Sequence, residues 1–482
     1  MAADTIAIPE EQGIETHGIE RVSPTTRTHV RIFDNFTMWL GANLVISTIA
    51  LGTLANFAFG LGFWDSVASI VIFNALGVLP VAFFSTLGPK LGLRQMTLTR
   101  FSFGWVGGII MAFFNVAACI AWSAVNVIVG GQLVVSLSNG AIPLWAAVLI
   151  IAILTTLVSI YGYRYVHRYE RWAWIPMAIM FFIMFIVGVP HFSITATPAF
   201  GLAEVAGFLT FGAAVYGFAT GWSSYAADYN VNQPEDTPPA RVFWLTSLGI
   251  FIPCVLLETL GMAFTTGIAN VPAWKAGFGN TGDVGGLLSA VVSPLGGFGK
   301  VLLVLLALSI VANNIPNDYS LGLSVQVFGK AFQKVKRYVW TLIGAVIYIT
   351  IAIIGSQNFA ATLSAFLLDV AYWLGAYGII LVLEHFVFRR GQYNVDDWNT
   401  PSKLPLGWAA IVALVAGLVG ALLGADQLNF QGFITRHINQ PNGIDLGFEL
   451  SVVFAAIVYL ILRRIELNTS PRGEMAAAAG GE

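Results

Sequence analysis

The sequence predicts an all-α integral membrane protein with 12 transmembrane helices. Its 482 residues are 57% hydrophobic and only 10% charged, and the mean hydropathy is +0.78. A soluble domain carries roughly 25% charged residues. The few charges cluster in short stretches between long uncharged runs, and about 20 apolar residues are enough for a helix to cross a bilayer. Composition and charge pattern therefore both favour a protein embedded in lipid.

Twelve stretches are long and apolar enough to be spans. They lie at 35–59, 66–88, 105–136, 142–162, 172–190, 204–227, 242–266, 297–328, 338–355, 360–386, 407–424 and 447–463. The polar segment 1–34 and the alanine- and glycine-rich segment 464–482 are expected to be cytoplasmic tails, without a cleavable signal peptide. Cys119 and Cys254 both fall inside spans, so no disulfide framework is expected.

The distribution of lysine and arginine predicts the orientation in the membrane. Three of the 23 basic residues, Lys275, Lys300 and Arg436, fall on one alternating set of segments between spans, and the remaining 20 fall on the other. The richly basic set includes both ends of the chain. We therefore expect a multi-pass protein of the plasma (inner) membrane with both termini in the cytoplasm.

The spans are compatible with two inverted repeats, at 35–190 and 204–386, followed by two further spans at 407–463. Glycines interrupt the first span of each set, in "WLGANLVISTIALGTLANFAFG" and "FLTFGAAVYGFATGWSSYAAD". We expect these helices to unwind, although the small residues could instead serve only close helix packing. The segment "DVGGLLSAVVSP" is too short to cross and is expected to form an external hairpin or lid.

Several spans carry polar and aromatic residues at membrane depth, where polar groups are costly unless they face a cavity or a partner. Span 8 places Asn313, Asn314 and Asn317 around Pro316, and the proline is expected to break or bend the helix. Asn313 and Asn317 share one face at i, i+4, whereas Asn314 is turned away by about 100°. The other spans contribute Ser47, Trp122, Asn126, Phe218 and Trp222.

These residue types predict a flat, neutral, hydrogen-bonding pocket. Aromatic faces can enclose a planar ring, and amides can donate to and accept from its edge. No lysine or arginine is expected at this depth, which weighs against a phosphate, a carboxylate, a nucleotide or a nucleic acid as ligand. The alternative is that Trp122 only packs and that the asparagines only join helices to one another.

Motifs along the chain match those of a known family. They are "GIERV", "ANLVISTIALG", "LTRFSFG", "VHRYERWAWIP", "SSYAADYNVNQP" and "ANNIPNDYSLGLSVQVFG". Over about residues 20–465 the chain resembles the nucleobase:cation symporter-1 family, and within it the purine–cytosine permeases of the fungal-like branch. The resemblance implies a leucine-transporter-type fold with five-plus-five inverted repeats and two C-terminal helices. It also implies uptake of cytosine and purines (adenine, guanine, hypoxanthine) with a cation, by alternating access.

The resemblance further implies substrate-binding roles for residues already noted. These are Trp122, Asn126, Trp222, Phe218, Asn313, Asn314, Ser47 and Pro316. Trp122 would stack on the ring and Asn126 would bond to it. Asn313 and Asn314 would bind or support the substrate, with Pro316 shaping a helix break. For the other face of the ring Trp222 is favoured over Phe218, and Ser47 is the chosen serine of span 1.

The co-transported cation is expected to be a proton rather than sodium, and no other cofactor or metal is expected. Sodium-coupled bacterial members place a Ser-Thr pair about two turns before the proline, where this chain has Ala307 and Leu308. The intramembrane carboxylates Glu258 and Asp369 are the coupling candidates, unless they are neutral or paired. Asp228 and Asp318 lie near cytoplasmic helix ends and are expected to cap helices or anchor loops.

Other functions have less support. The six histidines are scattered, and neither a His-Glu-x-x-His motif nor a repeated selectivity filter is present, which weighs against a membrane enzyme and a channel. Carriers of allantoin, hydantoin, uracil, pyridoxine or thiamine would share the same scaffold, and some are sodium-coupled. The expected partners are a small-molecule nucleobase and the lipid bilayer, with the chain a monomer or weak homo-oligomer.

Overall fold

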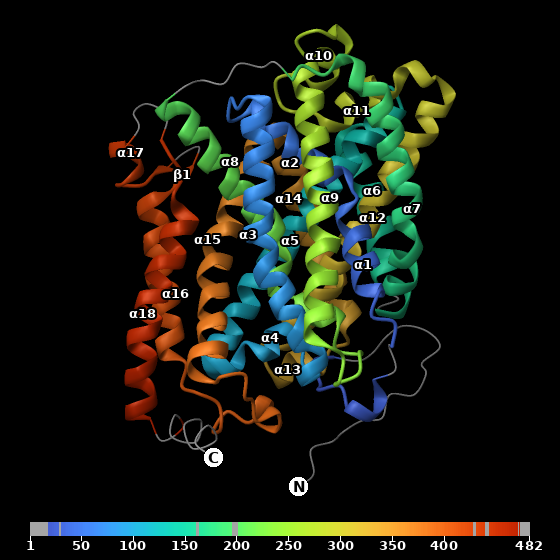
Figure 1. Ribbon diagram of the computed structural model, residues 1–482. Helices are drawn as coiled ribbons and strands as arrows, with labels where there is room; N and C mark the ends of the chain where they lie inside the picture. The colour runs from blue at the N-terminus through green and yellow to red at the C-terminus, as the bar shows by residue number, and fades with distance from the viewer. Residues whose placement is uncertain are drawn as a thin grey trace.

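The protein is an array of long helices that run side by side (Figure 1). The structure, a computed structural model, describes residues 18–27, 30–160, 163–194, 201–427, 430–438, 443–470 and 472. Within this part of the chain the two-stranded pairing of β1 with β2 is the only sheet, an antiparallel hairpin in which Asp426 pairs with Gln431. The fold is therefore all-α, as the composition predicts.

The helices of the first half are α1 (Asp34–Asn43), α2 (Ile46–Phe57), α3 (Phe63–Leu91), α4 (Gln95–Leu98), α5 (Arg100–Leu137), α6 (Leu144–Ile160) and α7 (Tyr163–Gly188). They are followed by α8 (Leu202–Thr220), α9 (Pro239–Gly267), α10 (Pro272–Phe278), α11 (Val284–Val292), α12 (Gly297–Gln326), α13 (Lys330–Gln333), α14 (Arg337–Gly355) and α15 (Phe359–Leu383). The chain ends with α16 (Trp408–Gly424), β1 (Asp426–Gln427), β2 (Phe430–Gln431), α17 (Thr435–Ile438) and α18 (Gly447–Thr469).

Each of the twelve expected spans falls on a helix or a broken helix. Seven helical stretches of the described chain are long and apolar enough to cross a membrane, and the bent pair α1–α2 makes an eighth. The apolar helices α6 and α16 are shorter, with 17 residues each. The protein is thus a multi-pass membrane protein, and the count of twelve crossings stays a prediction.

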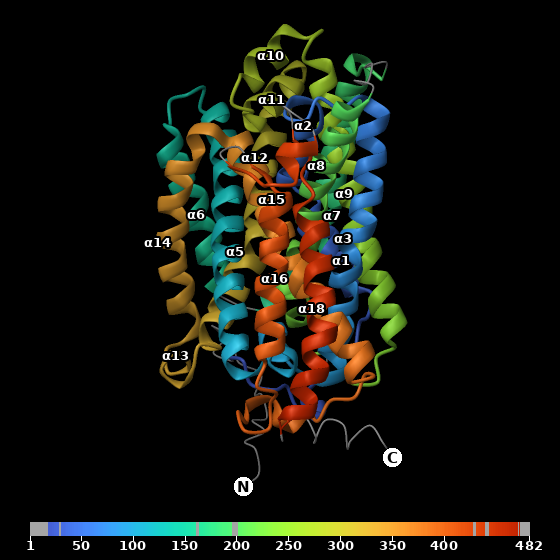
Figure 2. The same cartoon turned by 90° about the vertical axis from the view of Figure 1, so that its left-hand side faces the viewer.

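The ends of the described chain lie at one end of the array. Val22 N donates to Gly92 O, 2.9 Å, beside α4, and α18 ends on the same side as α4 and α13 (Figure 1). The α10–α11 pair and the β1–β2 hairpin lie at the opposite end. The segment 283–294 forms α11, which packs on α10 as a hairpin; that it lies on the external side stays a prediction. On one side of the array, α16 and α18 pack on each other and against α15 (Figure 2).

The first span is broken, as expected, by 54° between α1 and α2. The break lies at Leu44 and Val45, and Val45 has extended backbone angles. It leaves backbone carbonyls without helical donors, and side chains supply the missing bonds. Asn313 Nδ2 donates to Ala42 O, and Thr48 Oγ1 donates to Asn43 O at 2.7 Å. Tertiary partners therefore stabilise the broken conformation.

The sixth span also unwinds as expected. The helix α8 ends at Thr220 and continues as two 3₁₀ turns, η3 (Gly221–Ser224) and η4 (Ala226–Tyr229). In span 8 the chain is not interrupted, because α12 continues as a helix through Pro316; a bend at the proline stays a prediction. Tyr229 of η4 donates its hydroxyl to Pro316 O, 2.9 Å.

Glycines allow a very close crossing of α2 and α9. A Cβ atom on Gly52 of α2 would lie 1.9 Å from Glu258 O of α9, and one on Gly261 of α9 would lie 2.1 Å from Ile49 O of α2. Real Cβ atoms do not approach an oxygen so closely, so both positions require glycine. The backbones of α2 and α9 therefore touch at two points, one turn apart.

Candidate functional site

A small internal cavity lies where the two broken helices meet α5 and α12. Its lining residues are Trp122, Phe218, Gly221, Trp222, Tyr225, Asn313 and Asn317. The free volume is about 10 Å³, which holds about one water molecule. A flat ring therefore enters only if these side chains move apart. Every lining side chain is aromatic or an amide, apart from the glycine, and none carries a charge.

The aromatic side chains are held by contacts on several elements. Trp222 Nε1 donates to Asn43 Oδ1, 3.1 Å, at the end of α1. The Trp122 ring makes edge contacts with Phe218, at a centroid distance of 5.4 Å, and with Phe366 of α15, at 4.8 Å. These T-shaped contacts fix the planes of the rings. The predicted aromatic residues of spans 3 and 6 thus meet at one place.

The amides of α12 reach the cavity from one face of the helix. Asn313 and Asn317 line it, four residues apart, as their spacing predicts. Tyr225 donates its hydroxyl to Asn317 Oδ1, 2.7 Å. Asn317 belonged to the predicted polar pocket but not to the substrate-binding residues that the resemblance implies, and Tyr225 belonged to neither set. The i, i+4 spacing from Asn313 is the sequence feature that places Asn317 on the cavity side of α12. The position of Tyr225 in the lining depends on the path of the 3₁₀ segment after α8, which the sequence pattern does not predict.

Three further predicted residues form a hydrogen-bonded chain beside the cavity rather than its lining. Ser47 Oγ donates to Asn126 Oδ1, 2.7 Å, and Asn126 Nδ2 donates to Asn314 Oδ1, 3.2 Å. Asn314 Oδ1 also accepts from Asn317 Nδ2, 3.3 Å. The chain links α2, α5 and α12 and ends on a lining residue. Ser47, Asn126 and Asn314 are thus positioned to orient the lining amides.

Two buried donors of this region have no hydrogen-bond partner among the described residues. They are Trp122 Nε1 and Asn314 Nδ2. A buried N–H group without an acceptor is destabilising by about 1–3 kcal/mol. A ligand with acceptor atoms on its edge would remove this penalty.

The predicted coupling carboxylates lie apart from the cavity. Glu258 of α9 is fully buried; Asn74 Nδ2 donates to its Oε2, 2.7 Å, and its Oε1 has no partner in the described chain. Asp369 of α15 is exposed and accepts from Gln427 Nε2 of β1, 3.2 Å. Neither residue lines the cavity.

The two aspartates that were expected to cap or anchor behave differently. Asp228 Oδ1 accepts from Gln95 N, 2.7 Å, at the start of α4, which is an anchoring contact. Asp318 lies in the interior of α12, four residues after Asn314, where no helix end needs a cap. The capping prediction is therefore wrong for Asp318.

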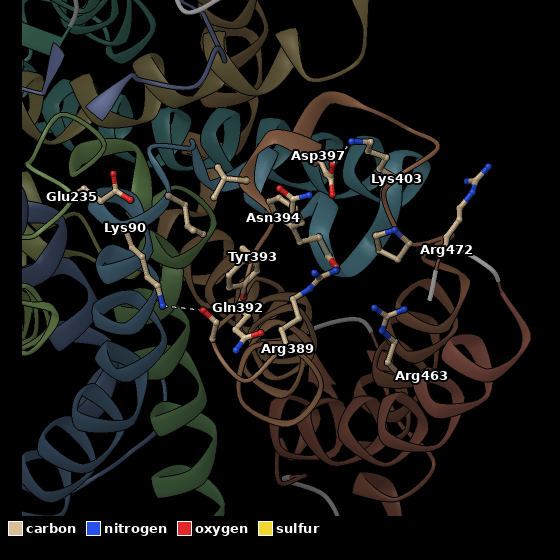
Figure 3. A pocket seen from close by; sticks show the side chains of 15 residues that line it. Lys90, Glu235, Arg389, Gln392, Tyr393, Asn394, Asp397, Lys403, Arg463 and Arg472 are labelled. Atoms are coloured by element: carbon tan, nitrogen blue, oxygen red, sulfur yellow. Dashed lines mark hydrogen bonds and ion pairs between the residues drawn. The ribbon is translucent and has the colours of Figure 1, made fainter. Parts of the chain in front are cut away.

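A second, larger pocket of about 720 Å³ opens at the end of the array that holds α4 and α13 (Figure 3). Its charged lining residues are Lys90, Glu235, Arg389, Asp397, Lys403, Arg463 and Arg472. Beside it lies the Glu384 cluster, which consists of Glu384, Arg389, Tyr459, Arg463 and Glu466. Glu384 opens a π-helical turn, η7 (Glu384–Phe388), and accepts from Arg389 Nε at 2.9 Å and Arg463 Nη2 at 2.8 Å.

Sequence comparison connects this architecture with known permeases. A family described as permease for cytosine/purines, uracil, thiamine, allantoin matches residues 22–451. The chain belongs to this permease family. It is 44% identical over 462 residues to the purine-cytosine permease fcyB of Emericella nidulans, covering 95% of this chain and 90% of the relative. The family consists of carriers, so the enzyme alternative is excluded.

Two other relatives come from Saccharomyces cerevisiae. The purine-cytosine permease FCY2 is 39% identical over 462 residues, covering 94% of this chain and 86% of the relative. The vitamin B6 transporter TPN1 is 30% identical over 514 residues, covering 95% and 88%.

The fold is that of a solved transporter. Mhp1, a nucleobase-cation-symport-1 family transporter in a closed conformation with bromovinylhydantoin bound, superposes with a TM-score of 0.72 at 16% identity, covering 95% of this chain and 96% of that chain. Its inward-facing conformation gives 0.70 at 15% identity, covering 96% and 97%. The prediction of this transporter fold is thus confirmed.

Proposed function

We propose that the chain takes up cytosine and purine nucleobases (adenine, guanine and hypoxanthine) by cation symport, through alternating access in the plasma membrane. The observation that carries the proposal is the uncharged cavity of aromatic rings and amides between two broken helices. A neutral planar heterocycle matches both features, because its faces stack on aromatic rings and its edge carries donors and acceptors.

In the proposed binding mode the side chains divide into two roles. Trp122 and Trp222 stack on the two faces of the ring, and Asn313 and Asn317 bond to its edge. The chain of Ser47, Asn126 and Asn314 holds the amides in register. The lining amides Asn313 and Asn317 each carry both a donor and an acceptor, which suits a base with carbonyl oxygen and ring nitrogen atoms along its edge.

The proposed coupling ion is a proton. Sodium needs hard oxygen ligands, and the span-8 segment that would offer hydroxyl groups presents Ala307 and Leu308. The next residue, Ser309, donates its hydroxyl to Leu306 O within its own helix, 2.7 Å. We further propose that both termini are cytoplasmic, that the five-plus-five repeat moves as in other carriers of this fold, and that the chain acts as a monomer or weak homo-oligomer.

A second candidate is a carrier for another neutral heterocycle, such as pyridoxine, allantoin, hydantoin or uracil, with sodium as a possible coupling ion. We retain this alternative because one relative, 30% identical, is named as a vitamin B6 transporter. Its substrate is also an uncharged ring with polar edges, so the cavity alone does not separate the two.

Uptake of radiolabelled cytosine in a transport-null host separates them. Adenine, guanine, hypoxanthine, uracil, allantoin and pyridoxine serve as competitors, with and without sodium and with a protonophore. We expect competition by purines and loss of uptake with the protonophore alone. Pyridoxine as the strongest competitor, or a strict need for sodium, would favour the second candidate.

The site itself is tested by Asn313→Ala, with Asp396→Ala as the control because Asp396 is exposed at the surface, at 78% of its side chain. Loss of an amide that bonds the substrate lowers uptake by roughly 10- to 100-fold, whereas the control retains wild-type uptake. Unchanged uptake by a well-expressed Asn313→Ala variant would show that the cavity is not the substrate site.

A further inference from the structure

Asp318 is a buried carboxylate directly below the substrate cavity. Asp318 is 1% exposed. It lies on α12, which packs against α5, α6 and α14. Ser123 Oγ of α5 donates to its Oδ1, 3.2 Å, and Thr341 Oγ1 of α14 donates to its backbone oxygen, 3.2 Å. The Ser159 hydroxyl of α6 also faces the carboxylate, but it donates to Thr155 O, 2.9 Å.

The second carboxylate oxygen, Oδ2, has no hydrogen-bond partner within the described residues. The neighbouring Asp228 differs, because its Oδ1 accepts from Gln95 N and its Oδ2 accepts from Ser320 Oγ, 3.2 Å. Asp228 is thus engaged through both oxygens, whereas Oδ2 of Asp318 has no partner at hydrogen-bond geometry among the described residues, with the Ser159 hydroxyl nearby. A proton can bind there without breaking an existing bond.

Asp318 is also joined to the substrate site by two parallel helix contacts. On α12 it lies four residues, or about one turn, beyond Asn314. On α5 its partner Ser123 lies between Trp122 of the cavity and Asn126, which donates to Asn314 Oδ1. The Ser123–Asp318 and Asn126–Asn314 bonds therefore tie the same two helices together on successive turns.

The ionisable groups around Asp318 come from three elements. Arg337 of α14 is within electrostatic reach, and its Nε and Nη1 have no partner among the described residues. Tyr348 of α14 and Cys119 of α5 also face the carboxylate. Asp228 of η4 contacts Ser320 on the next turn of α12, and α6 contains no ionisable residue. Arg94 lies beside Tyr319, with Nη2 donating to the Tyr319 hydroxyl, 3.0 Å. Arg337 is the cation that attracts the carboxylate when the proton leaves.

We propose that Asp318 is the proton-binding group that couples transport, in place of the carboxylates at 258 and 369; this rests on the proposed proton symport. An O–H bond forms at Oδ2 with a proton from the outer solution and breaks toward the cytoplasm, so one proton crosses per cycle. A bond from Ser123 is stronger to the charged form than to the neutral acid. Protonation therefore loosens α5 against α12 next to Trp122 and Asn126.

A polar route continues toward the end of the array that holds the termini. Asn115 Nδ2 of α5 donates to Ser324 Oγ, 2.7 Å, and to Ser320 Oγ, 3.4 Å, on α12. These groups continue the α5–α12 interface beyond Asp318. They supply exchangeable hydrogens between the carboxylate and the cytoplasmic side, which an apolar helix interface would not do.

The experiment compares driven and undriven transport in liposomes that contain the purified full chain. A gradient of one pH unit at 1:1 coupling drives about tenfold accumulation of cytosine. We expect Asp318→Asn to lose accumulation and cytosine-induced acidification of the lumen, yet to retain exchange of cytosine at equal pH. The matched variant Glu258→Gln, also buried, should keep both. Asp318→Glu should restore part of the accumulation.

The outcomes separate the inference from the function on which it rests. If the wild-type protein exchanges cytosine but never accumulates it in a pH gradient, proton symport itself is wrong. If Asp318→Asn accumulates cytosine like the wild type, or if Glu258→Gln alone loses coupling, the role of Asp318 is overturned. Should Asp318→Asn not fold, Ser123→Ala replaces it, and an unshifted pH profile of uptake in that variant would likewise contradict the inference.

Discussion

The proposed substrate cavity and the Glu384 cluster both contain buried polar side chains, but those of the cavity are neutral and those of the cluster are mostly charged. The cavity is lined by aromatic rings and neutral amides, whereas Glu384 accepts from Arg389, Arg463 and Tyr459. A neutral hydrogen bond contributes about 0.5–1.5 kcal/mol net, whereas breaking a buried ion pair costs about 3–5 kcal/mol. In this comparison the charged side chains hold one another in fixed contacts, whereas the proposed substrate site is lined by neutral groups that can exchange contacts with a ligand.

The strongest test of this contrast is Glu384→Ala. It leaves two arginines without their shared anion, at a cost of about 3–5 kcal/mol. We expect a clear fall in the melting temperature of the purified protein, with an unchanged KM for cytosine in the fraction that folds. The control is Asp396→Ala, which removes an exposed pair with Arg21, 3.2 Å, worth about 0–1 kcal/mol. Equal melting temperatures for the two variants would refute the structural role of the cluster.

The complementary change in the cavity is Asn317→Ala. It removes a lining amide and the acceptor of the Tyr225 hydroxyl, so cytosine uptake should fall by roughly 10- to 100-fold. Thermal stability should change less than for Glu384→Ala, because no charge is left unpaired. Competition binding and a melting curve on the same preparation measure both effects. If Asn317→Ala lowered the melting temperature strongly but bound cytosine normally, the role of Asn317 would be structural, and the proposed difference between the cavity and the Glu384 cluster would be wrong.

The smallest change concerns the size of the cavity. A Cβ atom on Gly221 would lie 3.0 Å from Cζ2 of Trp122, so Gly221→Ala narrows the space beside this ring. Bicyclic purines should lose affinity relative to cytosine by roughly tenfold, the scale of one added methyl group in a pocket. Competition by adenine against labelled cytosine reads this ratio directly. Equal losses for both bases would mean that Gly221 does not set the size limit.

Hydropathy predicted the helices because lipid requires an apolar surface along each span. It did not locate the break in the first one. Leu44 and Val45 have no helix-breaking character, and the broken backbone depends on donors such as Asn313 and Thr48. At Pro316 the opposite holds, because α12 continues as a helix past a residue that lacks a backbone donor. Local sequence cannot report partners that fold in from elsewhere.

The candidate site was predictable where periodicity decided the outcome. The spacing of Asn313 and Asn317 gives one helix face, and both residues line the cavity. The family resemblance also selected Asn314, which lies on a different face of the helix. In the structure Asn314 is hydrogen-bonded to Asn126 and Asn317 beside the cavity and does not line it. Tyr225 had no sequence signal, because its position follows from the 3₁₀ turns after α8.

The glycine crossing of α2 and α9 has a mechanical consequence for the transport cycle. Because the backbones of α2 and α9 touch at Gly52 and Gly261, these two helices cannot slide past each other, and we expect them to move as one rigid unit. The other half of the first span is packed on the same helix, since a Cβ atom on Gly249 of α9 would lie 2.8 Å from Phe36 O of α1. We therefore expect both halves of the first span to move together with α9, so that α1, α2 and α9 shift as one body during transport.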